Sequence, residues 1–513
     1  MESLLLALYF ATLLVLCVFG LHRAHLVTLC WWHKDRIAQK GRLPRNERVL
    51  RDARTTGAAE LPSVTVQLPL YNEATVVSRL LEAVGRLDYP KHLLQVQVLD
   101  DSTDETRALS RAKVEQLRAR GLDIVQVARP NRVGYKAGAL DYGLLSARGE
   151  LVAIFDADFV PQPDFLRRVV GHFRDPHVGM VQTRWGHLNR DAGLITRIQA
   201  LMLDGHHLVE NRARFGAGCL FNFSGTGGIW RRAAIEAAGG WQHDTLTEDL
   251  DLSYRAQLAG YRFIYRSDVV TPAELPEDMS AFRAQQFRWA KGTVQTARKL
   301  LRTVWSAPLT LGQRIEASFH LLPHFAYPLM LLLSVLLLPA LMLMPATDVE
   351  TMLVIDLPLC LGATGSLAGF YVTAERAQGR SGWAAVVRLP ALIALGAGLA
   401  PNQTRAVFAG MRAMAGEFVR TPKRGEKAGR YGQVSELPLL ELALATLSLA
   451  SVVVALQTAH WFAAPFAMLF FCGYAFVAFR VVAEQVTQRR TVSTVPAESD
   501  GPAVEPVGVA RAA

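Results

Sequence analysis

The chain has 513 residues, of which 51% are apolar and 19% are charged. This composition is too long for one ordinary domain and too apolar for an ordinary soluble protein, so it predicts a globular part joined to membrane spans. The net charge of +10 lies mainly beside the apolar stretches, which is typical of a cytoplasmic membrane face rather than of a nucleic-acid site, and five cysteines without a CxxC pair indicate neither a disulfide framework nor a thiolate zinc site.

The first predicted element is an apolar run over residues 3–21, and about 20 such residues cross a bilayer as a helix. Glu2 precedes the run and basic residues follow it, from Arg23 to Arg54, which is the reverse of a cleaved signal peptide. We therefore expect a transmembrane anchor over residues 1–22 and a basic cytoplasmic linker over residues 23–59.

Three short apolar runs, 64–70, 94–99 and 151–155, have the composition of buried strands. Helical patterns over 74–86 and 103–120 lie between them, and this alternation predicts a parallel sheet in an α/β domain covering residues 60–310. Ligands bind beyond the carboxyl ends of the strands in such sheets.

Polar and acidic side chains follow each predicted strand at that edge. They are Tyr71 and Glu73, then Asp100 and Asp101, then Asp156 and Asp158. Any one of these acids has a plain alternative as a solvated strand end, but three strands delivering acids to one rim favour a site. Two of the carboxylates, Asp156 and Asp158, can hold one Mg²⁺ or Mn²⁺, a hard cation that also binds substrate phosphates.

Lys136 stands in the segment Gly134-Tyr135-Lys136-Ala137-Gly138. Flanking glycines allow the backbone and the ammonium group to approach a diphosphate closely. The GxxxxGK[ST] spacing of a P-loop is missing, so we interpret Lys136 as a substrate-binding cation only.

Four further spans are predicted after the globular part, over 321–344, 352–373, 437–457 and 461–482. The stretch 386–400 contains Arg388 and Pro390, which suits an interfacial or re-entrant helix better than a span. Residues 374–433 hold ten Lys and Arg against three acids, whereas the loops 346–351 and 457–460 hold no Lys or Arg, so the globular part and 374–433 share the cytoplasmic side.

The expected organisation after the globular domain has four parts. They are 311–374 with an interface helix and two transmembrane helices, 375–433 with a cytoplasmic interfacial helix and loop, 434–485 with two transmembrane helices, and 486–513 as a disordered tail.

Three more motifs follow in order before the membrane: Ser224-Gly225-Thr226-Gly227-Gly228, Thr247-Glu248-Asp249 and Gln285-Gln286-Phe287-Arg288-Trp289. The whole series resembles the processive, membrane-embedded family-2 glycosyltransferases, which include cellulose, chitin and hyaluronan synthases, and most of all the cellulose-synthase-like mannan synthases. This resemblance covers roughly residues 60–430. It implies a GT-A-type nucleotide-sugar-binding domain inserted between transmembrane helices.

The resemblance also implies roles for the motif residues. Tyr71, Glu73, Asp100 and Asp101 would help to seat the nucleoside, and Asp156 and Asp158 would bind the cation and the diphosphate. Asp249, beside Glu248, would be the catalytic base, with Asp101 as the second candidate. Gln285, Arg288 and Trp289 would occupy the constant positions of the Q-x-x-R-W motif; a membrane-interface anchor is the alternative for Trp289.

A last match lies in the 374–433 segment. Phe418, Thr421 and Lys423 have the spacing of the F-x-V-T-x-K gating loop of cellulose synthases, whereas Arg420 replaces its Val and resembles the mannan-synthase branch. The segment 221–226 also lacks the Cys that cellulose synthases place near the acceptor. Both departures argue against cellulose as the product.

The resulting hypothesis is an inverting, metal-dependent, processive transfer of a hexose from GDP-mannose or UDP-glucose to a β-linked polysaccharide, coupled to export through the cell membrane. Its partners would be the nucleotide sugar, the polysaccharide acceptor, the lipid bilayer and export or accessory subunits, with no nucleic acid. The first alternative is a single transfer to a lipid acceptor. The second is a transporter or receptor, which the nearly bare spans disfavour.

Overall fold

The computed structural model describes residues 1–40, 61–344, 361–416 and 438–494. Its centre is a seven-stranded sheet in the order β3-β2-β1-β4-β6-β5-β7. The strands are β1 (Val64–Leu70), β2 (Leu94–Asp100), β3 (Asp123–Val127), β4 (Leu151–Ile154), β5 (Val178–His187), β6 (Gly228–Arg231) and β7 (Arg262–Ala273).

The first half of the sheet agrees with the prediction. β1 pairs in parallel with β2 on one side and with β4 on the other, so the three predicted strands are neighbours. The helices α4 (Val77–Gly85) and α5 (Thr106–Ala119) follow β1 and β2, as the helical patterns indicated. This arrangement confirms the α/β domain and brings the carboxyl ends of the three strands to one edge.

The second half corrects the prediction of a wholly parallel sheet. β6 runs antiparallel to both of its neighbours, β4 and β5, so the sheet is mixed. β7 then pairs in parallel with β5 at the far edge. The four residues of β6 are too few to show a period that the sequence could reveal.

Two hydrophobic cores cover the two faces of the sheet. On β4, Leu151 and Ala153 belong to one core with α4 and α5, whereas Val152 and Ile154 belong to the other with α6 (Tyr135–Leu144). Alternate residues of a strand point to opposite faces, which explains this division. Full burial of an aliphatic side chain contributes about 1.5–3 kcal/mol, so this doubly covered sheet gives the site a rigid base.

The remaining helices cover the sheet or continue into the apolar part of the chain. The helices that precede the apolar region in the chain are, besides α4, α5 and α6, α7 (Phe165–Val169), α8 (Leu194–Gly205), α9 (Asn211–Ala217), α10 (Arg232–Ala237), α11 (Glu248–Leu258), α12 (Met279–Ser306) and α13 (Leu311–Leu321). A π-helical turn, His206–Glu210, joins α8 to α9. The apolar region contains α1 (Glu2–Trp32), α14 (Ala326–Leu343), α17 (Ser366–Arg376), α18 (Gly382–Arg412), α19 (Leu439–Gln457) and α20 (Ala463–Thr494), and α2 (Lys34–Lys40) follows α1.

Within the described ranges, five helices are long and apolar enough to cross a membrane: Glu2–Trp32, Pro323–Leu343, Gly382–Arg412, Leu439–Gln457 and Ala463–Thr487. Four of them coincide with predicted spans. Residues 352–360 of the predicted span 352–373 lie outside the described residues, and its remainder forms the π-helical segment Leu361–Gly365 and the first part of α17. The helix predicted over 386–400 is longer, because α18 continues through Pro390 and Pro401, and its interfacial placement stays a prediction.

Two predicted boundaries differ from the structure. α1 continues ten residues past the expected anchor end at 22, since no Gly or Pro interrupts residues 21–32, and α2 follows within the expected linker. α20 continues to Thr494, so helix extends past the expected start of the tail at 486.

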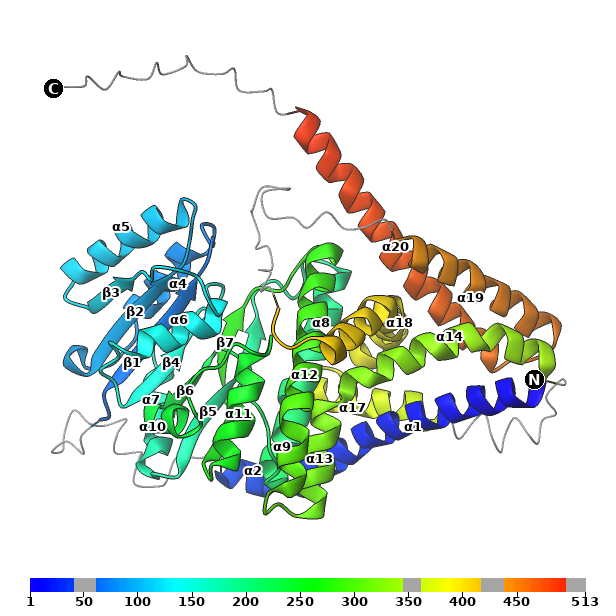
Figure 1. Ribbon diagram of the computed structural model, residues 1–513, viewed down its shortest axis with the longest axis horizontal. Helices are drawn as coiled ribbons and strands as arrows, with labels where there is room; N and C mark the ends of the chain where they lie inside the picture. Colours follow the sequence, from blue (N-terminus) through cyan, green and yellow to red (C-terminus); the bar gives the residue numbers. More distant parts are fainter. Residues whose placement is uncertain (41–60, 345–360, 417–437, 495–513) are drawn as a thin grey trace, which may run out of the picture.

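One long helix, α12, stands between the sheet and the apolar helices (Figure 1). It packs against α11 of the sheet domain and against α18 and α20 of the apolar region. The structure is therefore a mixed α/β domain flanked by apolar helices, which agrees with the predicted insertion of an α/β domain between apolar segments.

The N-terminal helix is attached to this domain by buried polar contacts. His22 of α1 lies 2.8 Å from Glu316 of α13, and the other carboxylate oxygen of Glu316 accepts from Arg214 of α9 at 2.9 Å. A buried ion pair needs such complete pairing, because removing one partner leaves a charge without solvation.

Candidate active site

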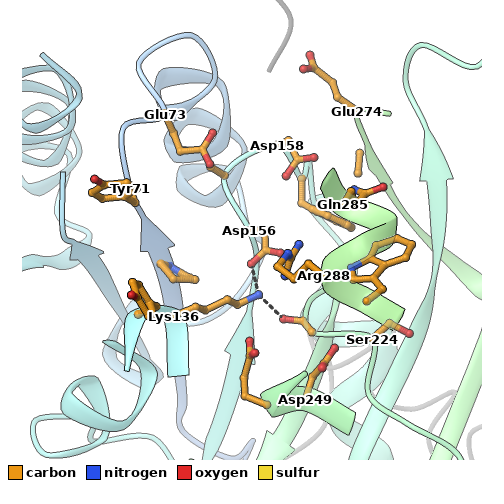
Figure 2. Close-up of a pocket in the computed structure, with 18 of the residues that line it drawn as sticks. Tyr71, Glu73, Lys136, Asp156, Asp158, Ser224, Asp249, Glu274, Gln285 and Arg288 are labelled. Carbon is orange, nitrogen blue, oxygen red and sulfur yellow. Dashed lines mark hydrogen bonds and ion pairs between the residues drawn. The ribbon is translucent and has the colours of Figure 1, made fainter. Parts of the chain in front are cut away.

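A cavity of about 180 Å³ opens at the carboxyl edge of β1, β2 and β4 (Figure 2). It contains most of the predicted site residues. These are Tyr71, Glu73, Asp101, Lys136, Asp156, Asp158, Glu248, Asp249, Gln285, Arg288 and Trp289. Side chains separated by more than 200 positions in the sequence thus share one cavity.

The turn after β1 is tied to the turn after β2. Asn72 has a left-handed backbone with φ 56°, a conformation that Asn tolerates better than most residues. Its amide donates to Ser102 Oγ at 2.9 Å, and its Oδ1 accepts from the amide of Thr103 at 2.8 Å. These bonds fix the position of the acidic residues after β1 relative to those after β2.

Asp100 and Asp101 point in opposite directions, as consecutive residues of an extended chain do. Asp100 is 2% exposed, and its oxygens accept from Ser110 Oγ at 2.6 Å and from Gln126 Nε2 at 2.7 Å. It therefore braces the strand end from behind the cavity, whereas Asp101 lines the cavity with both oxygens held by Arg129 at 2.6 and 2.8 Å.

Lys136 enters the cavity from the first turn of α6. Its Nζ atom donates to Asp156 Oδ1 at 2.5 Å and to the carbonyl oxygen of Gly225 at 2.9 Å. Burial alone would lower the pKa of Lys136, but the negative charges of Asp156, Glu248 and Asp249 outweigh it, and the pKa is raised. The ammonium group is consequently charged throughout the physiological range.

Gly225 provides the space in which Lys136 and Asp249 approach each other. Its backbone has φ 82°, and a Cβ atom there would lie 2.9 Å from Asp249 Oδ2 and 3.6 Å from Lys136 Nζ. Any side chain would therefore be strained and would displace the carboxylate.

Asp249 stands in the first turn of α11, where its Oδ1 accepts from the amide of Leu250 at 2.8 Å. Burial and the neighbouring charge of Glu248 raise its pKa from 3.8 to about 7, against the opposing effects of Lys136, Leu250 and Arg288. A carboxylate with a pKa near the operating pH is suited to accept a proton from a substrate hydroxyl.

The wall opposite the strand ends is formed by α12. Gln285, Arg288 and Trp289 line the cavity, whereas Gln286 is buried away from it at 6% exposure. Burial lowers the pKa of Arg288, and the charges of Glu248, Asp249 and Asp156 favour its charged form. Arg288 therefore faces the same acids as Lys136 from the other side of the cavity.

Asp156 and Asp158 have the donor chemistry for a hard divalent cation. Both line the cavity, and Asp158 is only 6% exposed. In the part of the chain that the structure describes, no group of three or more His, Cys, Asp or Glu side chains is arranged to hold a metal ion. Two carboxylates fit Mg²⁺ or Mn²⁺ bound jointly with substrate phosphates, because such ions commonly take one or two protein carboxylates.

Sequence reasoning missed Arg132. Its guanidinium group stacks on the ring of Tyr71, 3.3 Å from the centroid, and lies 4.9 Å from the ring centroid of Tyr135. All three residues line the cavity, so this stacked cluster forms its β1 end. An arginine four residues before Lys136 was the available signal, but it belongs to no motif.

Sequence reasoning also missed Trp185, His187 and Glu274, which lie on or just beyond β5 and β7 and line the cavity. Trp185 Nε1 donates to the carbonyl oxygen of Thr226 at 3.3 Å, and His187 Nε2 lies 3.1 Å from Asp204 Oδ1. Glu274 accepts from Arg79 at 2.6 Å. Neither strand was predicted, so these side chains could not be assigned to the rim.

Phe418, Thr421 and Lys423, the expected gating-loop residues, lie outside the described residues. The segment that leads toward them is described as far as Gly416. There the amide of Ala415 donates to the carbonyl oxygen of Asp244 at 2.6 Å, beside the cavity residues Leu246 and Thr247.

Residues 62–292 match the family model described as "Glycosyltransferase like family 2". Among curated proteins, the chain is 42% identical over 260 residues to glucomannan 4-beta-mannosyltransferase 2 of Arabidopsis thaliana, covering 50% of this chain and 49% of that protein. It is 41% identical over 270 residues to glucomannan 4-beta-mannosyltransferase 1 of Oryza sativa subsp. japonica, covering 52% of each. The chain spans about half the length of the curated relatives it matches.

Among solved structures, the mannosyltransferase PcManGT from Pyrobaculum calidifontis in complex with GDP-Man and Mn²⁺ is 25% identical. The match covers 68% of this chain and 97% of that one, with a TM-score of 0.44.

Proposed function

We propose that the chain, whose residues 62–292 match the family-2 glycosyltransferase model, transfers a hexose from a nucleotide sugar to a β-linked glycan with inversion at the anomeric carbon. The main supporting observation is that three kinds of functional group share one cavity. They are the acid pair Asp156 and Asp158, the cations Lys136 and Arg288, and the carboxylate Asp249 with a pKa of about 7. GDP-mannose is the proposed donor, supported by the names of the relatives at 41–42% identity.

The donor half of the reaction requires stabilisation of a leaving diphosphate. Asp156 and Asp158 would hold Mg²⁺ or Mn²⁺, which when bound supplies positive charge to the phosphate oxygens. Lys136 and Arg288 add fixed cations around the same space, and because they are buried they act in a medium of low dielectric constant. The stacked side chains of Tyr71 and Arg132 offer a flat surface for the nucleoside.

The acceptor half requires a base on the side of the sugar opposite the leaving group. Asp249 would take the proton of the acceptor hydroxyl as the oxygen attacks the anomeric carbon. General-base assistance of this kind typically increases a rate by about 10²–10⁴. Trp289, the residue that follows Arg288 on α12, would provide the flat apolar face on which the acceptor sugar stacks.

Processive synthesis and export are part of the proposal. The helix that carries Trp289 also packs against the apolar helices α18 and α20, so an acceptor held at Trp289 lies next to the candidate membrane region. The catalytic domain would face the cytoplasm, where nucleotide sugars are found, and the strongly basic segment 374–433 supports that orientation. Accessory subunits would serve export beyond this membrane.

The test is synthesis by the purified full chain in lipid vesicles. Labelled GDP-mannose and UDP-glucose are supplied separately, each with Mg²⁺ or Mn²⁺, and the product is sized and digested with β-mannanase and with cellulase. A long product from GDP-mannose that β-mannanase degrades is expected. A single sugar on an extractable lipid would establish the lipid-acceptor alternative, and absence of transfer from both donors would reject the proposed function.

A further inference from the structure

The helix that forms one wall of the cavity also binds the loop that precedes Asp249. Gln295, six residues beyond Trp289 on α12, is fully buried at 0% exposure. Its Oε1 atom accepts from the amide of Leu246 at 3.0 Å. Leu246 lies three residues before Asp249, so this bond holds the approach to the proposed base.

The other end of the same side chain binds a second segment. Gln295 Nε2 donates to the carbonyl oxygens of Ala413 at 2.8 Å and Ala415 at 2.7 Å. A primary amide has two N–H donors, and both are used here. One buried side chain therefore joins three parts of the chain: α12, the loop before Asp249, and the residues that follow α18.

Those residues are held in an unusual conformation. Ala415 has φ 60°, a left-handed backbone that costs energy for any residue other than glycine and persists only where the surroundings enforce it. The enforcing contacts are the bond from its amide to Asp244 and the bond from Gln295 to its carbonyl oxygen. Lys299, one turn further along α12, donates to Asp244 Oδ1 at 2.7 Å and so fixes the accepting residue as well.

α12 and the loop before Asp249 pack as closely as their backbones permit. A Cβ atom on Gly292 would lie 2.6 Å from Thr247 Cγ2 and 2.8 Å from the carbonyl carbon of Leu246. Such distances do not occur in folded proteins, so only glycine allows this approach. On the next turn, the hydroxyl groups of Thr296 and Thr247 lie 3.1 Å apart.

We propose that Gln295 is a positioning residue for the transfer reaction, which holds Asp249 in constant relation to Arg288 and Trp289 on the same helix. The proposal rests on the proposed function, because it assigns Gln295 to the placement of the base relative to the acceptor platform. Since a helix is rigid over two turns, the bond to Leu246 transfers the position of α12 directly to the loop. Gln295 itself makes no contact with substrate.

The experiment compares Gln295→Met with Gln97→Met in the full chain in vesicles. Gln97 is a matched control, because it is also 0% exposed and its amide also makes two side-chain hydrogen bonds, to Gln67 and Ser146 at 3.0 Å each. Misplacement of a reacting group by about 1 Å can cost about 100-fold in rate, so Gln295→Met should lower kcat roughly 10- to 100-fold. KM for the donor and Kd for the nucleoside diphosphate should stay within about twofold of the unchanged chain, because the donor contacts are untouched.

Two further variants keep the test decisive. Gln295→Glu retains the oxygen that accepts from Leu246, and because burial favours the neutral carboxyl group, it also retains one O–H donor toward the carbonyl oxygens of Ala413 and Ala415. This variant should therefore recover part of the kcat lost in Gln295→Met. Thr296→Val removes one hydroxyl at nearly constant volume and, should Gln295→Met not accumulate, should still lower kcat several-fold without weakening donor binding.

The outcomes separate this inference from the proposed function. If the wild-type chain is active and either Gln295→Met or Thr296→Val turns over no more slowly than Gln97→Met, the positioning role is overturned. A loss in Gln295→Met that resides wholly in donor KM would also overturn it. If the wild-type chain turns over neither nucleotide sugar, the proposed function itself is rejected.

Discussion

Lys136 and Asp156 are joined by a contact of 2.5 Å between Nζ and Oδ1 at the centre of the cavity. This contact connects the two proposed halves of the reaction, because Asp156 belongs to the metal-binding pair while Lys136 also lowers the pKa of Asp249. A single ammonium group therefore influences both donor binding and proton acceptance.

Lys136→Met is expected to weaken donor binding and to shift the pH dependence together. Loss of a charge-assisted hydrogen bond costs about 1.5–3 kcal/mol, which corresponds to roughly 10- to 100-fold in donor affinity. Without the positive charge the pKa of Asp249 rises further, so the acid limb of kcat should move to higher pH. Donor titrations and kcat profiles measure both effects, with Lys113→Met, which removes a lysine paired with Glu82 on α4, as control. An unchanged acid limb would contradict the electrostatic link.

The wild-type chain should lose transfer activity as the pH falls. The pKa of Asp249 is raised to about 7, so its basic form declines as pH falls through that value. At pH 6 kcat should be about one tenth of its plateau, and a profile measured from pH 5 to 9 tests this. The same shift contributes stability that is present below the unfolded pKa of 3.8 and is lost as pH rises through about 7, because the folded state retains the proton.

Asp249→Asn should separate base catalysis from binding. The amide cannot take up a proton, so turnover should fall by about 10²–10⁴. Affinity for the nucleoside diphosphate should remain within a few-fold, as measured by titration. Asp164→Asn, at an exposed carboxylate before α7, is the matched control. Strongly weakened nucleotide binding with unchanged turnover per bound donor would make Asp101 the better candidate for the base.

Asp158→Asn should remove the metal dependence of donor binding while the chain still folds. The substitution is nearly isosteric, but a hard cation loses an anionic oxygen ligand. Nucleotide-sugar affinity is measured with and without Mn²⁺ or Mg²⁺, and the expected stimulation by metal should disappear. A variant with full stimulation would place the cation on other residues.

Trp289→Ala should shorten the product without weakening donor binding. The indole is the proposed platform for the acceptor sugar, and its removal should let the chain end dissociate earlier. Size separation of the labelled product measures the change, and hydrolysis of the donor by water should persist. Unchanged product length together with poor membrane insertion would favour the membrane-anchor role for Trp289.

The first half of the fold could be predicted because its strands are buried on both faces. β1 and β2 are short runs rich in apolar residues that are followed at once by polar or acidic residues, a pattern typical of buried parallel strands. β3 is a five-residue edge strand with one exposed and three half-buried positions, and β6 has four residues, so neither shows a clear period. β5 and β7 are long, but the last four positions of β5 are half-buried and β7 mixes buried, half-buried and exposed positions, so neither shows a regular pattern.

Site residues could be predicted where they belong to a sequence motif. They were missed where only the pairing of distant strands brings them to the cavity. Asp156, Asp249 and Trp289 belong to motifs, and the structure places all three in one cavity. His187 and Glu274 enter that cavity only because β5 and β7 pair with each other. Asp100 was expected to contact substrate, yet the side-chain alternation that directs Asp101 into the cavity turns Asp100 away from it.

Arg288 and Gln295 lie seven residues apart, about two turns of α12, and so share one face of the helix, which restricts how this part of the chain can change in length. An α-helix has about 3.6 residues per turn, so inserting or deleting one residue between these positions would rotate Gln295 by about 100° around the helix axis relative to Arg288. The amide would then leave Leu246, and a residue other than Gly292 would meet the backbone of Thr247. Between these two residues the spacing is therefore part of the active-site geometry, so substitutions can be accommodated there more readily than a change in the number of residues.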